Sequence, residues 1–218
     1  MKKVALSLIC ALAILFCGCG NSDTVNTSAS DDSPATTPNN ATTNQDSNEN
    51  EDTKDTSIAF GYSFDEAVTS LQQGIAGTSA DGFLTDEYTK SEQEATENMP
   101  ADVVYIYAGP GNGHIMYYCV PETDEVYQIF YSVSVDSLNT TEAAKQHGAL
   151  LGALINTYES SESVRQKLDS DLDVLNLTDG TVNVSSGSAS SWSYMVNGGQ
   201  IMLSIMSTDY TEYVSTNS

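Results

Sequence analysis

Basic residues are scarce in this chain, which has seven lysines and arginines against thirty aspartates and glutamates and a formal net charge of −23 at pH 7. Proteins that bind the phosphate backbone of DNA or RNA need clustered lysine and arginine side chains. The same shortage disfavours adsorption to an anionic bilayer surface. We therefore expect no nucleic-acid partner. The acidic charge favours solubility, and a basic partner or divalent cations are the alternative explanation.

Long apolar runs are also missing. The apolar run from Val4 to Phe16 has 13 uncharged residues, whereas a helix that crosses the hydrocarbon core of a membrane needs about 20. Lys2 and Lys3 precede this run, and a charged start followed by a short apolar segment is typical of a secretory signal. The sequence therefore predicts a cleaved signal peptide and no transmembrane helix in the mature chain.

Two cysteines follow the apolar run directly. The stretch Phe16-Cys17-Gly18-Cys19 resembles the lipobox of bacterial lipoproteins, in which a small residue precedes the cysteine that receives the lipid. Cys19 fits as the acceptor because Gly18 is small, whereas Cys17 would place Phe16 where the small residue belongs. The alternative is an ordinary secretory signal with incidental cysteines.

The lipobox resemblance implies that cleavage before Cys19 leaves a diacylglyceryl anchor on this residue. Two acyl chains are sufficient for stable membrane attachment, where a single chain is not. The expected location is the extracytoplasmic face of the cell membrane, with membrane lipid as a partner through Cys19.

The composition divides the chain into three parts. Residues 1–18 are the expected signal peptide, residues 19–57 a tether that begins with the lipidated cysteine, and residues 58–218 a single globular domain. The tether is rich in serine, threonine, asparagine and aspartate, so we expect it to be disordered because it has too little apolar surface to bury. The domain, of about 160 residues, is large enough to bury a core.

Cysteine is nearly absent from the expected mature domain, where only Cys119 is left. No intramolecular disulfide is then possible, and the core alone must hold the fold. Cys119 lies in an apolar, strand-like run, where a free cysteine behaves as a small hydrophobic residue. We expect it to be buried and inert. A catalytic thiol would need a base close by, and His114 falls on the opposite face of such a strand.

Hydrophobic periodicity predicts an α+β domain. A capping box at Ser63 and Glu66 begins a helix that ends at Gly77, and residues 85–98 form an exposed helix or a loop. A long helix begins at Asn139. A shorter helix is expected over residues 161–175, and the tail from Ser207 is expected to fray. The expected strands are 103–107, 115–120, 125–135, 181–185, 191–196 and 200–206.

These elements predict an antiparallel sheet of about six strands in two three-stranded groups, with helices packed on one face. In the strand over 125–135, alternation places Tyr127, Ile129 and Tyr131 on one face. In the long helix, Ala144, Gly148 and Gly152 recur every fourth residue, so we expect that side of the helix to pack closely against a neighbour.

Three short motifs are weak candidates for chemistry. The Gly-rich stretch over 109–114 lacks the lysine of a phosphate-binding loop and precedes a strand, so we interpret it as a hairpin turn. Asp169, Asp171 and Asp173 have the spacing of a calcium loop, but the glycine and glutamate that an EF-hand needs are missing. We therefore interpret them as residues on the solvent-exposed face of a helix. His114 and His147 are the only histidines, too few for a typical zinc site, and we expect no metal or cofactor.

Tyrosines are the most suggestive feature of the domain. We select as candidate ligand-binding residues a group that lies on three adjacent expected strands: Tyr105, Tyr107, Tyr117, Tyr127 and Tyr131. Tyrosines on a sheet face that helices leave open can stack on a ligand or hydrogen-bond to it. The alternative is that tyrosine simply suits strands.

No nucleophile, metal set or cofactor loop stands out, so the sequence favours a non-catalytic binding or protein-interaction module over an enzyme. Its partner would be an envelope protein or ligand. The alternatives are a hydrolase that acts on envelope polymers, or an accessory subunit of a transport or assembly system.

Overall fold

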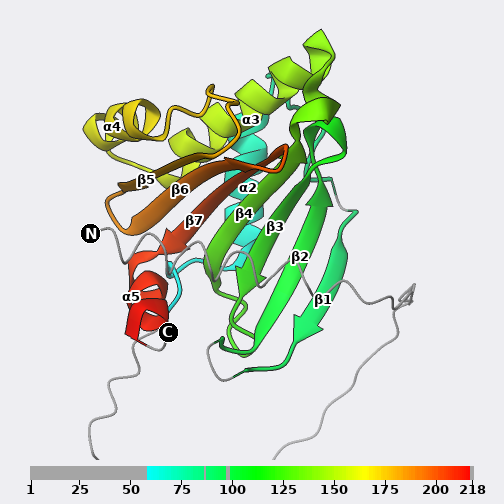
Figure 1. Cartoon of the computed structure of the whole chain (residues 1–218). Helices are drawn as coiled ribbons and strands as arrows, with labels where there is room; N and C mark the ends of the chain where they lie inside the picture. Colours follow the sequence, from blue (N-terminus) through cyan, green and yellow to red (C-terminus); the bar gives the residue numbers. More distant parts are fainter. Residues whose placement is uncertain (1–57, 86, 97–98, 217–218) are drawn as a thin grey trace, which may run out of the picture.

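The computed structural model describes residues 58–85, 87–96 and 99–216 (Figure 1). The expected signal peptide, the lipobox with Cys19 and the tether to residue 57 lie outside the described residues.

A single antiparallel sheet of seven strands organises the described chain, with the order β1-β2-β3-β4-β7-β6-β5. The strands are β1 (Thr89–Gln93), β2 (Asp102–Ala108), β3 (His114–Cys119), β4 (Val126–Ser134), β5 (Thr181–Ser186), β6 (Ser190–Asn197) and β7 (Gln200–Ser207). The α+β class with an antiparallel sheet is confirmed. The two expected three-stranded groups are not separate, because β4 pairs with β7 from Gln128–Met206 to Ser134–Gln200.

The seventh strand, β1, falls where the sequence predicted an exposed helix or loop. Every residue of β1 is exposed, and the strand pairs only with β2. An edge strand that is exposed on both faces has no alternation of apolar and polar residues, so hydrophobic periodicity could not predict it.

Three helices lie on one side of the sheet and one on the other (Figure 1). The first three are α2 (Phe64–Ile75), α3 (Thr141–Tyr158) and α4 (Glu162–Leu172), and the fourth is α5 (Thr208–Thr216). Two short 3-10 turns, η1 (Pro110–Asn112) and η2 (Val135–Leu138), flank the strands. The expectation that helices cover only one face is therefore wrong.

Helix α2 begins as the sequence predicts. The side chain of Ser63 accepts a hydrogen bond from the backbone N–H of Glu66, and the carboxylate of Glu66 accepts one from the N–H of Ser63 at 2.9 Å. The apolar residues that follow at helical spacing are buried: Phe64, Val68, Leu71 and Ile75. The reciprocal cap and the apolar stripe together position this helix on the sheet.

Helix α3 differs from its prediction in two respects. Its N-cap is Thr140, whose hydroxyl accepts a hydrogen bond from the N–H of Ala143, rather than Asn139. A Cβ atom at Gly148 or Gly152 would meet no atom within 4 Å, so the close packing expected on that side is wrong. The close approach instead occurs at Gly74 of α2, where a Cβ atom would lie 2.5 Å from the Thr157 hydroxyl.

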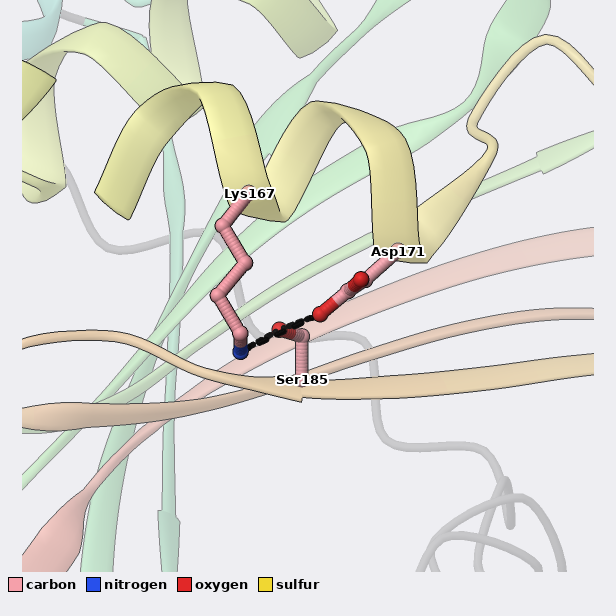
Figure 2. A network of polar contacts seen from close by, with 3 residues as sticks. All are labelled: Lys167, Asp171 and Ser185. Carbon is pink, nitrogen blue, oxygen red and sulfur yellow. Dashed lines mark hydrogen bonds and ion pairs between the residues drawn. The ribbon is translucent and has the colours of Figure 1, made fainter. Parts of the chain in front are cut away.

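Helix α4 is fixed to the edge strand β5 by a polar network (Figure 2). The Lys167 ammonium group lies 3.1 Å from the Asp171 carboxylate, and the hydroxyl of Ser185 on β5 donates to Asp171 at 2.7 Å. The helix ends earlier than expected because Asp173 adopts the left-handed conformation, with φ at 45°. Leu175 is consequently 79 % exposed instead of joining the apolar stripe.

A β-bulge in β4 changes which face Tyr127 occupies. Tyr118 pairs with Gln128 and Cys119 pairs with Val126, which leaves Tyr127 as the extra residue. The extra residue interrupts the alternation, so Tyr127 lies in the core cluster on the α5 side while Ile129 and Tyr131 lie under α2 and α3. The predicted common face is therefore wrong for Tyr127.

The tail that was expected to fray forms α5 and covers part of the second face of the sheet. Tyr210 and Val214 are buried, and the ring centroid of Tyr210 lies 4.4 Å from that of Tyr127. Methionines of the adjacent strands, such as Met202 and Met206, complete this smaller core. A nine-residue helix with only two buried positions leaves a weak pattern in the sequence.

Candidate functional site

The five candidate tyrosines are core residues rather than the lining of an open face. Each is 7 % exposed or less. Tyr105, Tyr107, Tyr117 and Tyr131 belong to the layer beneath the helices, and Tyr127 belongs to the opposite core. Phe64 of α2 covers this layer, with its ring stacked on Tyr105 at a centroid distance of 3.7 Å. The expected open tyrosine face is therefore wrong, because these side chains point toward the helices.

A pocket of about 650 Å³ opens beside this layer, and we call it the α2–α3 pocket. Four segments line it: Phe60 and Tyr62 before α2, the first two turns of α2, residues 157–160 at and just after the end of α3, and residues 188–190 in the β5–β6 loop and at the start of β6. The volume lies within the range of small-ligand sites, roughly 300–1,000 Å³.

Three aromatic rings form the apolar wall of the α2–α3 pocket. Phe60 and Tyr62 stack with ring centroids 5.3 Å apart, and Tyr62 and Tyr158 stack at 6.1 Å. All three residues are partly exposed and line the pocket, so a ligand in it would contact them. Rigid aromatic side chains give large contact area at low cost in side-chain entropy.

The hydroxyl groups beneath these rings are ordered by hydrogen bonds. The hydroxyl of Tyr158 donates to the carbonyl of Ala67 at 2.9 Å. The Tyr117 hydroxyl lies 3.2 Å from that of Tyr158, and it must be the donor because Tyr158 has already used its only proton. Burial raises the pKa of Tyr62 and Tyr158 well above the usual value, so both are neutral hydroxyl groups.

Glu159 forms the polar floor of the pocket and is only 1 % exposed. Its carboxylate accepts hydrogen bonds from the N–H of Ser161 at 2.9 Å and from the N–H and hydroxyl of Ser188 at 2.7 and 2.6 Å. Burial by itself would raise the pKa of Glu159, but the hydrogen bonds from Ser188 and Ser161 and the nearby Arg165 guanidinium outweigh it and lower the pKa. Glu159 is therefore an ionised residue that ties the end of α3 to the β5–β6 loop, and it is a poor general base.

Two further carboxylates come from the first turn of α2. Asp65 and Glu66 both line the pocket. Hydrogen bonds from the backbone and side chain of Ser63 lower the pKa of Glu66, so this carboxylate is ionised at neutral pH. Among the described residues that line the pocket, three are acidic and none is lysine, arginine or histidine.

The other candidate groups lie apart from the pocket. Cys119 is free and fully buried, as expected, and burial raises the pKa of its thiol. His147 is buried, and its Nδ1 atom lies 2.8 Å from the Tyr131 hydroxyl. His114 is exposed at the start of β3. Within the described residues, His147 is hydrogen-bonded to a tyrosine hydroxyl rather than to a serine or cysteine side chain.

Asp171 is one of the three aspartates with calcium-loop spacing. Its carboxylate forms an ion pair with Lys167 and accepts a hydrogen bond from Ser185 (Figure 2). Within residues 58–85, 87–96 and 99–216, no group of three or more histidine, cysteine, aspartate or glutamate side chains is arranged to hold a metal ion.

Sequence reasoning missed most of the α2–α3 pocket. Among its lining residues, the sequence singled out Glu66, as the capping residue of the first helix rather than as part of a site. Phe60 and Tyr62 belong to a short segment before α2, and Glu159 is the residue directly after the end of α3. Nothing in the local sequence indicates that these segments meet, since the pocket exists only once the β5–β6 loop packs against the end of α3.

No helix within the described part of the chain has the length and apolarity needed to cross a membrane. Comparison with known proteins finds no family model, no curated protein and no solved structure that matches this chain.

Proposed function

We propose that this protein is a lipid-anchored extracytoplasmic binding module that takes a small ligand in the α2–α3 pocket. The observation that carries the proposal is the pocket itself, whose lining combines three partly exposed aromatic residues with carboxylate and hydroxyl groups. A concave site with apolar walls and a few convergent polar groups is the usual form of a ligand site.

Binding is favoured over catalysis by the state of the polar groups. Glu159 is the buried carboxylate of the site, and its hydrogen bonds from Ser188 and Ser161 hold it ionised. A general acid or base works best with a pKa near the working pH. A carboxylate held this way is suited to fixing a ligand or a loop rather than to moving protons.

The anchoring part of the proposal rests on the resemblance of Phe16-Cys17-Gly18-Cys19 to a lipobox. We expect Cys19→Ala to move the protein from the membrane fraction to the soluble fraction of its cells, because the lipid acceptor is lost. Cys17→Ala is the matched control and should leave the protein on the membrane. Retention of the Cys19→Ala chain on the membrane would contradict the anchor.

The binding part is tested by filling the pocket. Ser70 lines the pocket from α2, while Gln73 on the same helix is exposed and does not line it. We expect a small-molecule extract of the cell envelope to raise the Tm of the wild-type chain and of Gln73→Trp, but not of Ser70→Trp. An equal rise for Ser70→Trp would show that the ligand binds elsewhere, and no rise in any of the three would contradict a binding role for this domain.

A further inference from the structure

We propose that the ligand of the α2–α3 pocket is a small organic cation with an alkylammonium group. This inference rests on the proposed function, since it names the chemical class of ligand for the same pocket. Three features of the lining support it: its charge, its aromatic rings and the way its carboxylates are held.

The charge of the lining has one sign. Asp65, Glu66 and Glu159 contribute carboxylates, and no cationic side chain is among the described lining residues. Outside the lining, the Arg165 guanidinium donates to the carbonyls of Glu159 at 2.9 Å and Ser160 at 3.1 Å. Its charge lowers the pKa of Glu159 and offsets part of that carboxylate's charge, so the attraction for a cation comes mainly from Asp65 and Glu66. A concave site that is lined by charge of one sign concentrates ligands of the opposite sign.

The aromatic rings suit the same ligand. Phe60 and Tyr62 stack with ring centroids 5.3 Å apart, and Tyr62 and Tyr158 stack at 6.1 Å. A cation in the pocket would therefore lie against the faces of Phe60 and Tyr158 that the other two rings do not cover. A cation within about 6 Å of a ring centroid is attracted by the negative face of the ring, and quaternary ammonium groups are typically held this way. The protein already contains one such contact, with the Lys90 ammonium 5.7 Å from the centroid of Tyr105.

Two of the three carboxylates are fixed before a ligand arrives. Glu159 accepts hydrogen bonds from Ser161 and Ser188, and Glu66 accepts them from Ser63. A carboxylate that is already oriented loses little side-chain entropy when a cation binds. Glu159 is almost fully buried, so it acts on a ligand through its charge, whereas Glu66 is exposed and can contact a ligand directly.

Anionic and neutral ligands fit less well. The positive end of the α2 dipole would favour an anion, but Asp65 and Glu66 occupy the first turn and offset it. A neutral polyol could hydrogen-bond to Ser70 or Ser188 and stack on the rings, but it would gain nothing from the net charge of the lining. The observations therefore favour a cation.

The test uses a ligand and its uncharged counterpart. Choline carries a trimethylammonium group, and 3,3-dimethylbutan-1-ol has the same shape with a neutral tert-butyl group. We expect calorimetric titration of the full-length protein in detergent to detect choline binding at low ionic strength, and the neutral alcohol to bind at least about tenfold more weakly. Raising the salt concentration from about 20 to about 500 mM should weaken choline binding, because ions screen the carboxylates.

Matched variants distinguish the effect of the pocket carboxylates on choline affinity from the effect of the protein's net charge. Asp65→Asn with Glu66→Gln removes two pocket charges but keeps the cap, since glutamine also serves in a capping box. This variant should lose at least about fivefold in choline affinity. Asp136→Asn with Glu142→Gln makes the same chemical change at two exposed positions in η2 and at the start of α3, away from the pocket, and should stay within about twofold of wild type.

Two results would overturn the inference. One is equal binding of choline and its neutral counterpart, which would make the site a neutral-ligand site. The other is no binding of either choline or the polyamine spermidine. If that happens while the envelope extract still stabilises Gln73→Trp but not Ser70→Trp, only the ligand class is wrong and the proposed function stands. If the extract also has no effect, the proposed function fails as well.

Discussion

Single buried polar residues carry much of the pH dependence expected for this domain. Two buried side-chain atoms within the described residues have no hydrogen-bond partner: His147 Nε2 and Asp102 Oδ1. Burial lowers the pKa of His147 to about 4, and burial raises the pKa of Asp102 despite a hydrogen bond from Tyr127. Both shifts favour the neutral form of the residue, which is the form that a core tolerates.

His147 should make the fold less stable in mild acid. Its pKa in the unfolded chain is near 6.5 and in the fold about 4, so between these values the unfolded chain binds a proton that the folded chain excludes. Stability from this residue is therefore complete above pH 6.5 and is lost as the pH falls toward 4. From pH 7.5 to 4.5 the loss amounts to about 2–3 kcal/mol.

The expected result is a smaller loss of unfolding free energy between these two pH values in His147→Asn than in wild type, measured by urea denaturation. Asparagine keeps a polar group near the Tyr131 hydroxyl but does not titrate. Asp102 and Glu159 contribute equally to both proteins, so the comparison isolates His147. His114→Asn, at an exposed position, should keep the wild-type difference. Identical pH dependence in wild type and His147→Asn would contradict the buried neutral histidine.

At the level of helices and strands, short-range sequence patterns predicted several elements, whereas features that depend on tertiary packing left no pattern in the sequence. The capping box at Ser63 and the existence of the long helix α3 were predicted because both depend on short-range patterns. The strand β1 and the helix α5 were missed because one is fully exposed and the other has only Tyr210 and Val214 buried. The bulge at Tyr127 adds one residue to a strand, and no local pattern indicates it.

The candidate site was less predictable than the fold for the same reason. Tyrosines were visible in the sequence, but whether a strand face is covered depends on where α2 packs, and Phe64 covers Tyr105. The α2–α3 pocket needs Glu159 and Ser188 to meet across 29 positions of sequence. A site built from the ends of separate elements appears only with the fold.

Two glycines in different elements should respond in opposite ways to alanine. Gly152 in α3 faces open space, so Gly152→Ala should stabilise the protein by about 0.5–1 kcal/mol through better helix propensity. In the β5–β6 loop, a Cβ atom at Gly187 would collide with the Ser190 hydroxyl and lie 2.8 Å from Trp192 Nε1 and 2.9 Å from Glu159. Gly187→Ala should therefore destabilise by about 1–3 kcal/mol.

Thermal and urea unfolding of the two glycine variants measures both effects. The Gly152 result also decides between the close packing that the spacing of Ala144, Gly148 and Gly152 predicted and the open space that the structure has. Destabilisation by Gly152→Ala would favour close packing. An unchanged Gly187→Ala would show that the β5–β6 loop is not held tightly against Glu159, which would weaken the described geometry of the pocket floor.

Over the whole molecule, the central pairing of β4 with β7 joins what the sequence presented as two halves. Ile129 pairs with Ile205 and Tyr131 pairs with Leu203, and the Gln128 amide donates to the Ser204 hydroxyl at 2.9 Å. The larger core runs through both halves, from Phe64 and Val103 to Trp192 and Ile205. Because neither half closes its own core, the described chain is expected to unfold as one unit.

Trp192 makes this cooperativity measurable, since it is the only tryptophan in the chain and lies fully buried in β6. Ile115 is equally buried in β3, in the other half of the sheet. Ile115→Ala should cost about 2–5 kcal/mol through lost burial and a cavity. The urea midpoint followed by Trp192 fluorescence should fall together with the midpoint followed by far-UV circular dichroism. The control is Lys90→Ala, at an exposed position on the edge strand. With either probe, it should change the free energy of unfolding by no more than about 0.5 kcal/mol. If Ile115→Ala left the Trp192 transition in place while part of the circular dichroism signal was lost, the two halves would be separate folding units and the β4–β7 pairing would not couple them.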